Sequence, residues 1–176
     1  RLAADNALTE TRYLEAERTT TTILYHDRLT LAAEATLAQV RANVVVAGFS
    51  ASRDRVSSSD TDAVGRVIRI YDALSSASAT SYEEYRYDAV GNRLATLDAR
   101  GSELAERNSD WAQAERARLG FPSDVSLLTE PLREALRARY TTTRTFDAAG
   151  RELSSTDPLG GVTRRSYDAL GNLVKL

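Results

Sequence analysis

The sequence predicts a mainly β fold with a helical insertion, an α+β chain built on an antiparallel sheet of β-hairpins. A six-residue pattern occurs four times: an aromatic residue or Thr, then Asp, two further residues, Gly, and finally Asn or Arg. β-branched and aromatic residues alternate with polar ones beside these copies, which is the period of a strand. Between two of the copies the composition changes to Ala, Glu, Arg and Leu, which favours helices.

Each copy of the pattern predicts the turn of a hairpin. Asp accepts a hydrogen bond from the backbone two residues further on, and Gly supplies a positive φ that other residues avoid. Because the copies are internal repeats, each is expected to bury its apolar face only against its neighbours. The turn residues predicted in this way are Asp62 and Gly65, Asp88 and Gly91, Asp147 and Gly150, and Asp168 and Gly171.

Residues 1–59 are predicted to be a mixed segment of strand, helix and strand. The β-branched density from Thr19 to Tyr25 favours a strand, whereas apolar residues at intervals of three and four from Asp27 to Val40 favour a helix. A buried strand is predicted from Val44 to Phe49, and a polar surface loop from Ser50 to Thr61.

Residues 60–101 are predicted to hold the first two repeat hairpins. The first turn is followed by Val67–Tyr71, a β-branched run with alternating isoleucines. Before the second turn, Tyr85 and Tyr87 are expected to lie on one face of the incoming strand, because successive side chains of a strand point to opposite faces.

Residues 102–140 are predicted to be a helical excursion. Asp110 is a candidate N-cap and Gly120 a C-terminal stop for a helix over residues 103–119, and a Glu-Pro pair opens a second helix over residues 130–139. The apolar side chains expected to pack these helices onto the sheet are Trp111, Leu119, Leu127, Leu128, Leu132 and Leu136.

Residues 141–176 are predicted to hold the last two repeat hairpins. Between them, the segment Asp157-Pro158-Leu159-Gly160-Gly161 predicts a second turn of opposite direction, so each period contains two strands. A lone hairpin buries too little to offset its backbone entropy. We therefore expect the outer strand of this part to be covered by residues 1–59, by a neighbouring chain or by sequence outside the chain.

The composition excludes several classes of site. The charges nearly cancel, with 23 basic and 25 acidic residues, so the basic stripe required for nucleic acid is missing. No apolar stretch reaches the ~20 residues that span a bilayer. The chain has no Cys and a single His, so no thiolate site and no His-based triad are expected within it. These observations predict a chain that is not an enzyme and that holds no metal or cofactor.

The pattern Tyr/Phe-Asp-x-x-Gly-Asn/Arg-x-Leu/Val, followed by a Thr-Asp-Pro-x-Gly turn, resembles the YD repeat of the Rhs and YD-repeat family. Residues 142–176 resemble it closely, residues 80–98 well, and residues 60–71 in the turn. The family includes Rhs-type polymorphic toxins, toxin-complex shell components and YD-repeat surface proteins. The resemblance implies a bacterial protein that is secreted or at the cell surface, with repeats that coil as a spiralling β-sheet into a shell.

The resemblance also implies a function. The chain is expected to be a structural scaffold module of a large exported protein, contributing to a β-shell that encloses or displays a toxin or adhesive domain. Its partner is then the remainder of the same polypeptide, with strand-edge self-association as a second expectation.

Two features leave alternatives to this interpretation. A surface module could bind a glycan or a receptor through exposed tyrosines, for which Tyr82, Tyr85 and Tyr87 are the candidates. The segment from Asp157 to Gly160 resembles the start of a self-cleaving segment in the family, but Gly161 follows where that segment has Leu. We therefore expect a plain turn there and no cleavage activity.

Overall fold

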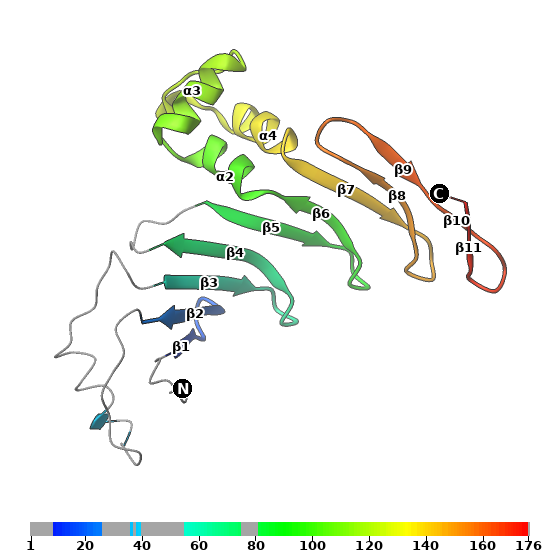
Figure 1. Ribbon diagram of the computed structural model, residues 1–176, viewed down its shortest axis with the longest axis horizontal. Helices are drawn as coiled ribbons and strands as arrows, with labels where there is room; N and C mark the ends of the chain where they lie inside the picture. The colour runs from blue at the N-terminus through cyan, green and yellow to red at the C-terminus, as the bar shows by residue number, and fades with distance from the viewer. Residues whose placement is uncertain (1–8, 26–35, 37, 40–54, 75–80, 176) are drawn as a thin grey trace. The chain divides into compact units, whose positions relative to one another are not determined.

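The computed structural model describes residues 9–25, 36, 38–39, 55–74 and 81–175 of the chain, which divides into two compact units, Arg1–Ala79 and Thr80–Leu176 (Figure 1). Its described part is mostly antiparallel β-sheet, with three α-helices in the second unit and helical residues at Ala38 and Gln39 in the first. The predicted mainly β fold with a helical insertion is therefore confirmed. Within the described part, no helix combines the length and the apolar character needed to cross a membrane.

Four antiparallel strands form the sheet of the first unit. They are β1 Thr9–Leu14, β2 Thr19–Leu24, β3 Arg55–Thr61 and β4 Val67–Leu74, paired in that order. The strand predicted from Thr19 is confirmed by β2.

The polar loop predicted from Ser50 to Thr61 is wrong from Arg55 onward, because this serine-rich run pairs on both sides as β3. Its hydroxyls find partners across the ladder, as Thr21 and Ser58 show with an oxygen–oxygen distance of 3.2 Å. The strand predicted over Val44–Phe49 lies outside the described residues, as does nearly all of the helix predicted over Asp27–Val40.

The second unit contains the remaining strands. One antiparallel sheet is formed, in this order, by β5 Tyr82–Tyr87, β6 Arg93–Leu97, β7 Thr141–Phe146, β8 Glu152–Thr156 and β9 Val162–Arg164. A separate hairpin is formed by β10 Ser166–Tyr167 and β11 Leu173–Lys175. The hairpins predicted around Gly91, Gly150 and Gly171 are all present.

The register of the repeat hairpins shifts by one residue beside each repeated turn. Tyr87 pairs with Arg93 whereas Arg86 pairs with Ala95, so Leu94 has no opposite residue. Such a bulge bends the strand and increases its twist. The equivalent positions in the other repeat hairpins are Ile68, Leu153 and Val174. The hairpin closed by Asp157–Gly161 has no register shift, so the bulge accompanies the repeated turns and is missing at this turn.

The helices connect β6 to β7. They are α2 Ala99–Glu106, α3 Asp110–Arg118, a short 3₁₀ segment η1 Val125–Leu127, and α4 Glu130–Ala138. Figure 1 shows them at the end of β5 and β6 opposite to the β5–β6 turn. The second predicted helix is confirmed by α4.

The single helix predicted over residues 103–119 is wrong. The chain leaves the helix at Arg107 and begins a new one after Ser109, whose hydroxyl accepts a hydrogen bond from the backbone N–H of Ala112 at 3.2 Å. Ser109 is therefore the N-cap, and Asp110 is the first helical residue.

The core of the second unit lies around these helices. Its buried apolar side chains are Tyr82 and Leu97 from the sheet, and Leu104, Ala105, Ala112, Leu128 and Leu136 from the insertion. Trp111 and Leu127 were expected to join them, but their side chains are 40% and 66% exposed. From Thr141 to Lys175, by contrast, no residue is buried.

Candidate functional site

The repeated turns use one arrangement of hydrogen bonds. Oδ1 of Asp147 accepts from the backbone N–H groups of Ala149 and Arg151, both at 2.9 Å, and Oδ2 accepts from Arg151 Nε at 2.7 Å. The backbone N–H of Gly150 donates to the Asp147 carbonyl at 3.0 Å, with Gly150 at φ 78°. Only glycine adopts such a φ without strain. The turns that begin at Asp62, Asp88 and Asp168 repeat each of these contacts.

The residue four positions after each Asp is a site residue that the turn rules for Asp and Gly do not identify. Its backbone N–H and its side chain both donate to the carboxylate, so it completes the turn. The sequence does contain the signal, because Arg or Asn stands there in every copy. These residues are Arg66, Asn92, Arg151 and Asn172.

The turn contacts lower the pKa of the repeated aspartates. For Asp147 the backbone N–H of Arg151 is the largest cause, partly opposed by desolvation. For Asp168 the largest cause is the side-chain amide of Asn172. At Asp62 and Asp88 desolvation is the largest effect and raises the pKa, but the hydrogen bonds together outweigh it. The carboxylates are thus held ionised and their oxygens are occupied by donors.

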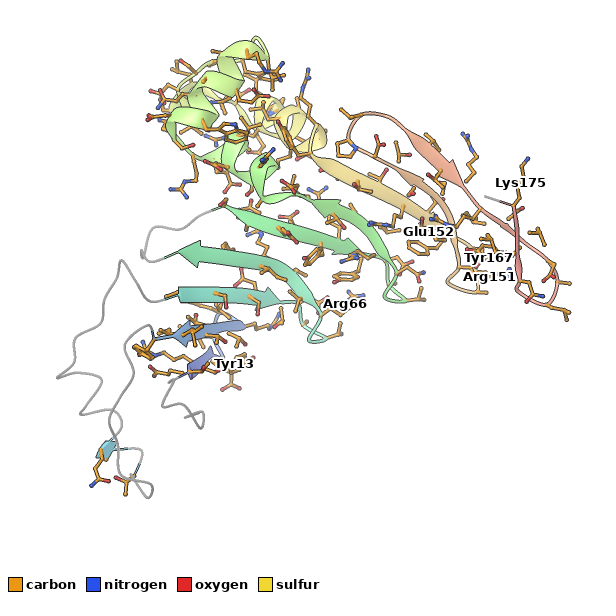
Figure 2. All side chains as sticks on the ribbon, viewed as in Figure 1. Tyr13, Arg66, Arg151, Glu152, Tyr167 and Lys175 are labelled. Atoms are coloured by element: carbon orange, nitrogen blue, oxygen red, sulfur yellow. The ribbon has the colours of Figure 1, made fainter. Side chains whose placement is uncertain are left out.

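Consecutive turns of the second unit touch each other. A Cβ built on Gly150 would lie 3.2 Å from Asn92 Oδ1, and one built on Gly171 would lie 3.5 Å from Arg151 Nη1. The guanidinium carbon of Arg151 also lies 4.8 Å from the centroid of the Tyr167 ring (Figure 2). The Arg or Asn of one turn therefore lies against the glycine of the next turn.

Glu152 attaches the last hairpin to the sheet. Its carboxylate forms ion pairs with Arg165 and, at 3.7 Å, with Arg144 of β7. Its backbone carbonyl accepts from the Tyr167 hydroxyl at 2.9 Å (Figure 2). The Arg165 N–H donates to the Leu153 carbonyl at 2.8 Å. These contacts link β7, β8 and β10.

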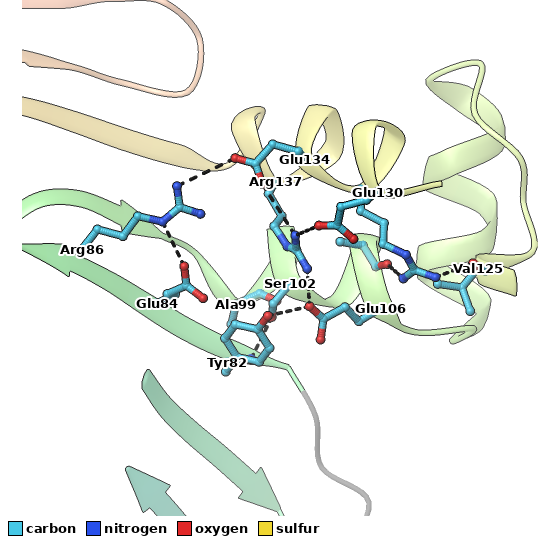
Figure 3. A network of polar contacts seen from close by, with 12 residues as sticks. Tyr82, Glu84, Arg86, Ala99, Ser102, Glu106, Val125, Glu130, Glu134 and Arg137 are labelled. Atoms are coloured by element: carbon cyan, nitrogen blue, oxygen red, sulfur yellow. Dashed lines mark hydrogen bonds and ion pairs between the residues drawn. The ribbon is translucent and has the colours of Figure 1, made fainter. Parts of the chain in front are cut away.

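Tyr82 packs under the helices. Its side chain is only 5% exposed, its hydroxyl donates to Glu106 Oε1 at 2.6 Å, and its backbone N–H donates to Ser102 Oγ at 2.8 Å (Figure 3). A ring enclosed in this way has no face open for a ligand, so Tyr82 does not belong to an exposed aromatic surface.

Tyr85 and Tyr87 are half-buried on β5. The Tyr85 hydroxyl donates to Glu83 at 2.6 Å, and the Arg93 guanidinium carbon lies 5.1 Å from the centroid of its ring. Desolvation, helped by the bond to Glu83, raises the pKa of Tyr85 to about 12. Arg93 thus occupies one face of the ring that a sugar would need for stacking.

An ion-pair network joins the helices to β5. Arg137 of α4 donates to Glu106 at 2.6 Å and to Glu130 at 2.9 Å (Figure 3). Since Glu106 also accepts from Tyr82, one carboxylate of α2 connects α4 with the sheet. Arg86 of β5 lies 3.8 Å from Glu134 at the edge of this network.

Arg116 has no exposed surface and holds the helical segments together. Its guanidinium donates to the carbonyls of Leu104 at 2.8 Å and Arg107 at 2.6 Å, where α2 ends, and to Ser123 at 2.9 Å from Nε. A fourth bond reaches Asn108 Oδ1 at 2.8 Å. Desolvation lowers the pKa of Arg116. Arginine is seldom fully buried, so no sequence pattern indicates this role.

The described residues contain no group of three or more His, Cys, Asp or Glu side chains placed to hold a metal ion. With Asp147 and its counterparts occupied by turn donors, the repeated carboxylates serve the backbone. The arrangement fixes the shape of hairpins and the contact between consecutive turns.

The comparisons with known proteins agree with this geometry. The family model described as RHS Repeat matches residues 146–176, which include the turns at Asp147, Asp157 and Asp168. Among curated protein sequences, no significant match to the chain was found. The recognition of the YD/Rhs repeat in the sequence is thereby confirmed.

Proposed function

Because residues 146–176 match the RHS repeat, we propose that this chain is a structural scaffold module of a large exported bacterial protein. Its repeats contribute to a spiralling β-shell that encloses or displays a toxin or adhesive domain. Its partner is the remainder of the same polypeptide, and the assembled protein is secreted or at the cell surface. The chain itself carries out no catalysis.

The observation that carries the proposal is the exposure of the C-terminal repeat. No residue from Thr141 to Lys175 is buried, although this segment forms five strands. A sheet becomes stable by burying one face against another layer. Repeat arrays obtain that burial from neighbouring units, so the exposure of this segment supports a place within a longer array.

The turns support the same role. Each repeated Asp accepts hydrogen bonds within its own turn, and in the second unit Asn92 and Arg151 each lie against the next repeated turn. These contacts specify how one hairpin follows another. A module of this kind extends a sheet by a fixed geometry per repeat, which is what a shell wall requires.

Single cysteines on adjacent residues of β8 test the proposal. Ser154 and Ser155 pair with consecutive residues of β9 without a bulge, so their side chains point to opposite faces of the sheet. In the full-length protein that contains this chain, Ser154→Cys and Ser155→Cys variants are treated with a maleimide too large to enter a closed shell. Labelling is measured by mass spectrometry of the peptide that contains residues 154–155.

We expect one of the two cysteines to be labelled and the other to be protected until the protein is denatured. Leu159→Cys is the matched control, because Leu159 lies at a turn and is 96% exposed, so it is labelled in every state. Equal labelling of both faces in the native full-length protein would contradict a shell wall.

A further inference from the structure

The helical module, defined as residues 99–139, stands where the neighbouring hairpin has a three-residue turn. The last residue pair before the connection is Leu97 with Thr141 between β6 and β7, and Thr156 with Val162 between β8 and β9. Residues 98 and 140 therefore hold the same places in the ladder as residues 157 and 161.

The backbone closes identically at both places. The Asp98 N–H donates to the carbonyl of Tyr140 at 3.0 Å, and the Asp157 N–H donates to the carbonyl of Gly161 at 2.9 Å. The same backbone hydrogen bond thus closes both connections, although the helical module places many more residues between its donor and its acceptor than the short turn does.

The module also starts as a turn. Asp98-Ala99-Arg100-Gly101 repeats the spacing of Asp and Gly found in the hairpin turns. Asp98 Oδ1 accepts from the Arg100 N–H at 2.8 Å, and the Gly101 N–H donates to the Asp98 carbonyl at 2.9 Å. Asp157 makes both contacts, at 2.8 Å to the Leu159 N–H and 3.0 Å from the Gly160 N–H.

The two paths separate at the glycine. Gly160 has φ 86° and returns the chain to the sheet, whereas Gly101 continues into α2. Gly101 is also where the two ends of the module meet. A Cβ there would lie 2.6 Å from Leu97 Cδ1 and 2.7 Å from Tyr140 Cβ, so the base of the module is closed around it.

Two of the side chains that differ between the sheet under the module and the next repeat are buried by the helices. Tyr82 and Leu97 are buried beneath the helices, and Tyr82 contacts Ser102 and Glu106. Counting along the strands from the repeated turns, Thr141 and Thr156 stand at these places in the hairpin of β7 and β8. Tyr82 and Leu97 thus occur where the helices cover the sheet, and Thr141 and Thr156 occur in the hairpin that is followed by the short turn.

We propose that the helical module is an insertion at one turn of the repeat, and that the sheet closes without it. The Asp that opens the turn and the residue that ends it form the site of insertion. This end of the strands therefore accepts an additional domain in the connection between two paired strands. The inference rests on strand register and hydrogen bonds, and is independent of the scaffold function proposed above.

In the full-length protein that contains this chain, where neighbouring repeats supply burial, the test replaces residues 99–140 by Pro-Leu-Gly-Gly, the sequence of residues 158–161. One short-turn variant keeps Tyr82 and Leu97, and a second also carries Tyr82→Thr and Leu97→Thr to remove the apolar surface that the module covers. Amide hydrogen exchange is measured for Arg93–Leu97 and Thr141–Phe146, with circular dichroism at 222 nm reporting the loss of helix.

We expect at least one short-turn variant to keep the exchange protection of β6 and β7 within about tenfold of the parent chain while the helical signal disappears. The matched control adds Asp98→Ala to that variant, which removes the turn carboxylate and reduces the protection further. Loss of β6–β7 protection in both short-turn variants would show that the sheet depends on the module and would overturn the inference.

Discussion

The guanidinium of Arg151 lies 4.8 Å from the centroid of the Tyr167 ring while its Nε donates to Asp147 at 2.7 Å (Figure 2). A single side chain therefore closes its own turn and contacts the aromatic residue that precedes the next turn. This contact between consecutive turns is made by side chains and adds to the backbone hydrogen bonds that join the repeats.

Arg151→Asn separates these two roles. Asn makes the same turn contact at Asn92 and Asn172, so the turn is retained and only the contact with the ring is lost. We expect the free energy of unfolding to fall by about 0.5–1 kcal/mol, measured by urea denaturation. In a Tyr167→Leu background the same substitution should cost almost nothing; an equal loss in both backgrounds would contradict the contact.

The lowered pKa of the turn aspartates predicts acid sensitivity. A carboxylate whose native pKa lies below its unfolded value of about 3.9 contributes its full stability above that value, and the contribution is lost as the pH falls through the native pKa. Asp147 and Asp168 are both lowered in this way. Asp147→Asn with Asp168→Asn keeps the Oδ1 acceptors but removes the titration.

The double variant should therefore show a flatter decline of the urea midpoint between about pH 5 and pH 2 than the parent chain. NMR titration of the parent should place the pKa of both aspartates below the usual range. Parallel pH profiles in the two proteins would contradict the assignment.

Gly101→Ala should destabilise the base of the helical module. The added Cβ meets Leu97 and Tyr140 at less than 3 Å, and overpacking of this kind costs about 1–3 kcal/mol. Gly160→Ala is the matched comparison, since nothing lies within 4 Å of its Cβ and the cost comes from its positive φ. Asn adopts a positive φ with less strain than Ala, so the free energy of unfolding, measured by urea denaturation, should fall less for Gly160→Asn than for Gly160→Ala. At Gly101, where space is limiting, it should fall more for Gly101→Asn than for Gly101→Ala.

Arg116→Leu should unfold the helical module. It leaves the carbonyls of Leu104, Arg107 and Ser123 without their donor, at a cost of about 3 kcal/mol or more. Arg118→Leu is the control, because Arg118 is 67% exposed in its pair with Glu115 and should change stability by less than about 0.5 kcal/mol. The ellipticity at 222 nm, followed against urea, distinguishes the two.

The turns were predictable because their determinants are local. Asp and Gly three residues apart fix the hydrogen bonds of each hairpin, and the structure repeats them at Asp62, Asp88, Asp147 and Asp168. Strand β3 was not predictable in the same way. A serine-rich run has low intrinsic preference for a strand, and its pairing with β2 and β4 is a tertiary effect.

The helical module shows what composition leaves undetermined. Its Ala- and Leu-rich sequence indicates helix, but the break between α2 and α3 depends on the Ser109 cap and on Arg116, which binds the end of α2 from a distance. Asp98-Ala99-Arg100-Gly101 carried a visible turn signal. The residues that follow continue it as a helix, so the local pattern alone does not decide the direction of the chain at Gly101.

The hydrogen bond from the Asp98 N–H to the Tyr140 carbonyl brings together two residues that the whole helical module separates along the chain, directly beside the last residue pair of β6 and β7. On the insertion proposed above, a gene for such a repeat would gain or exchange coding sequence at this turn without a change in strand order. Differences between related sequences would then concentrate in the connections at this end of the strands, while the spacing between the strands stays constant.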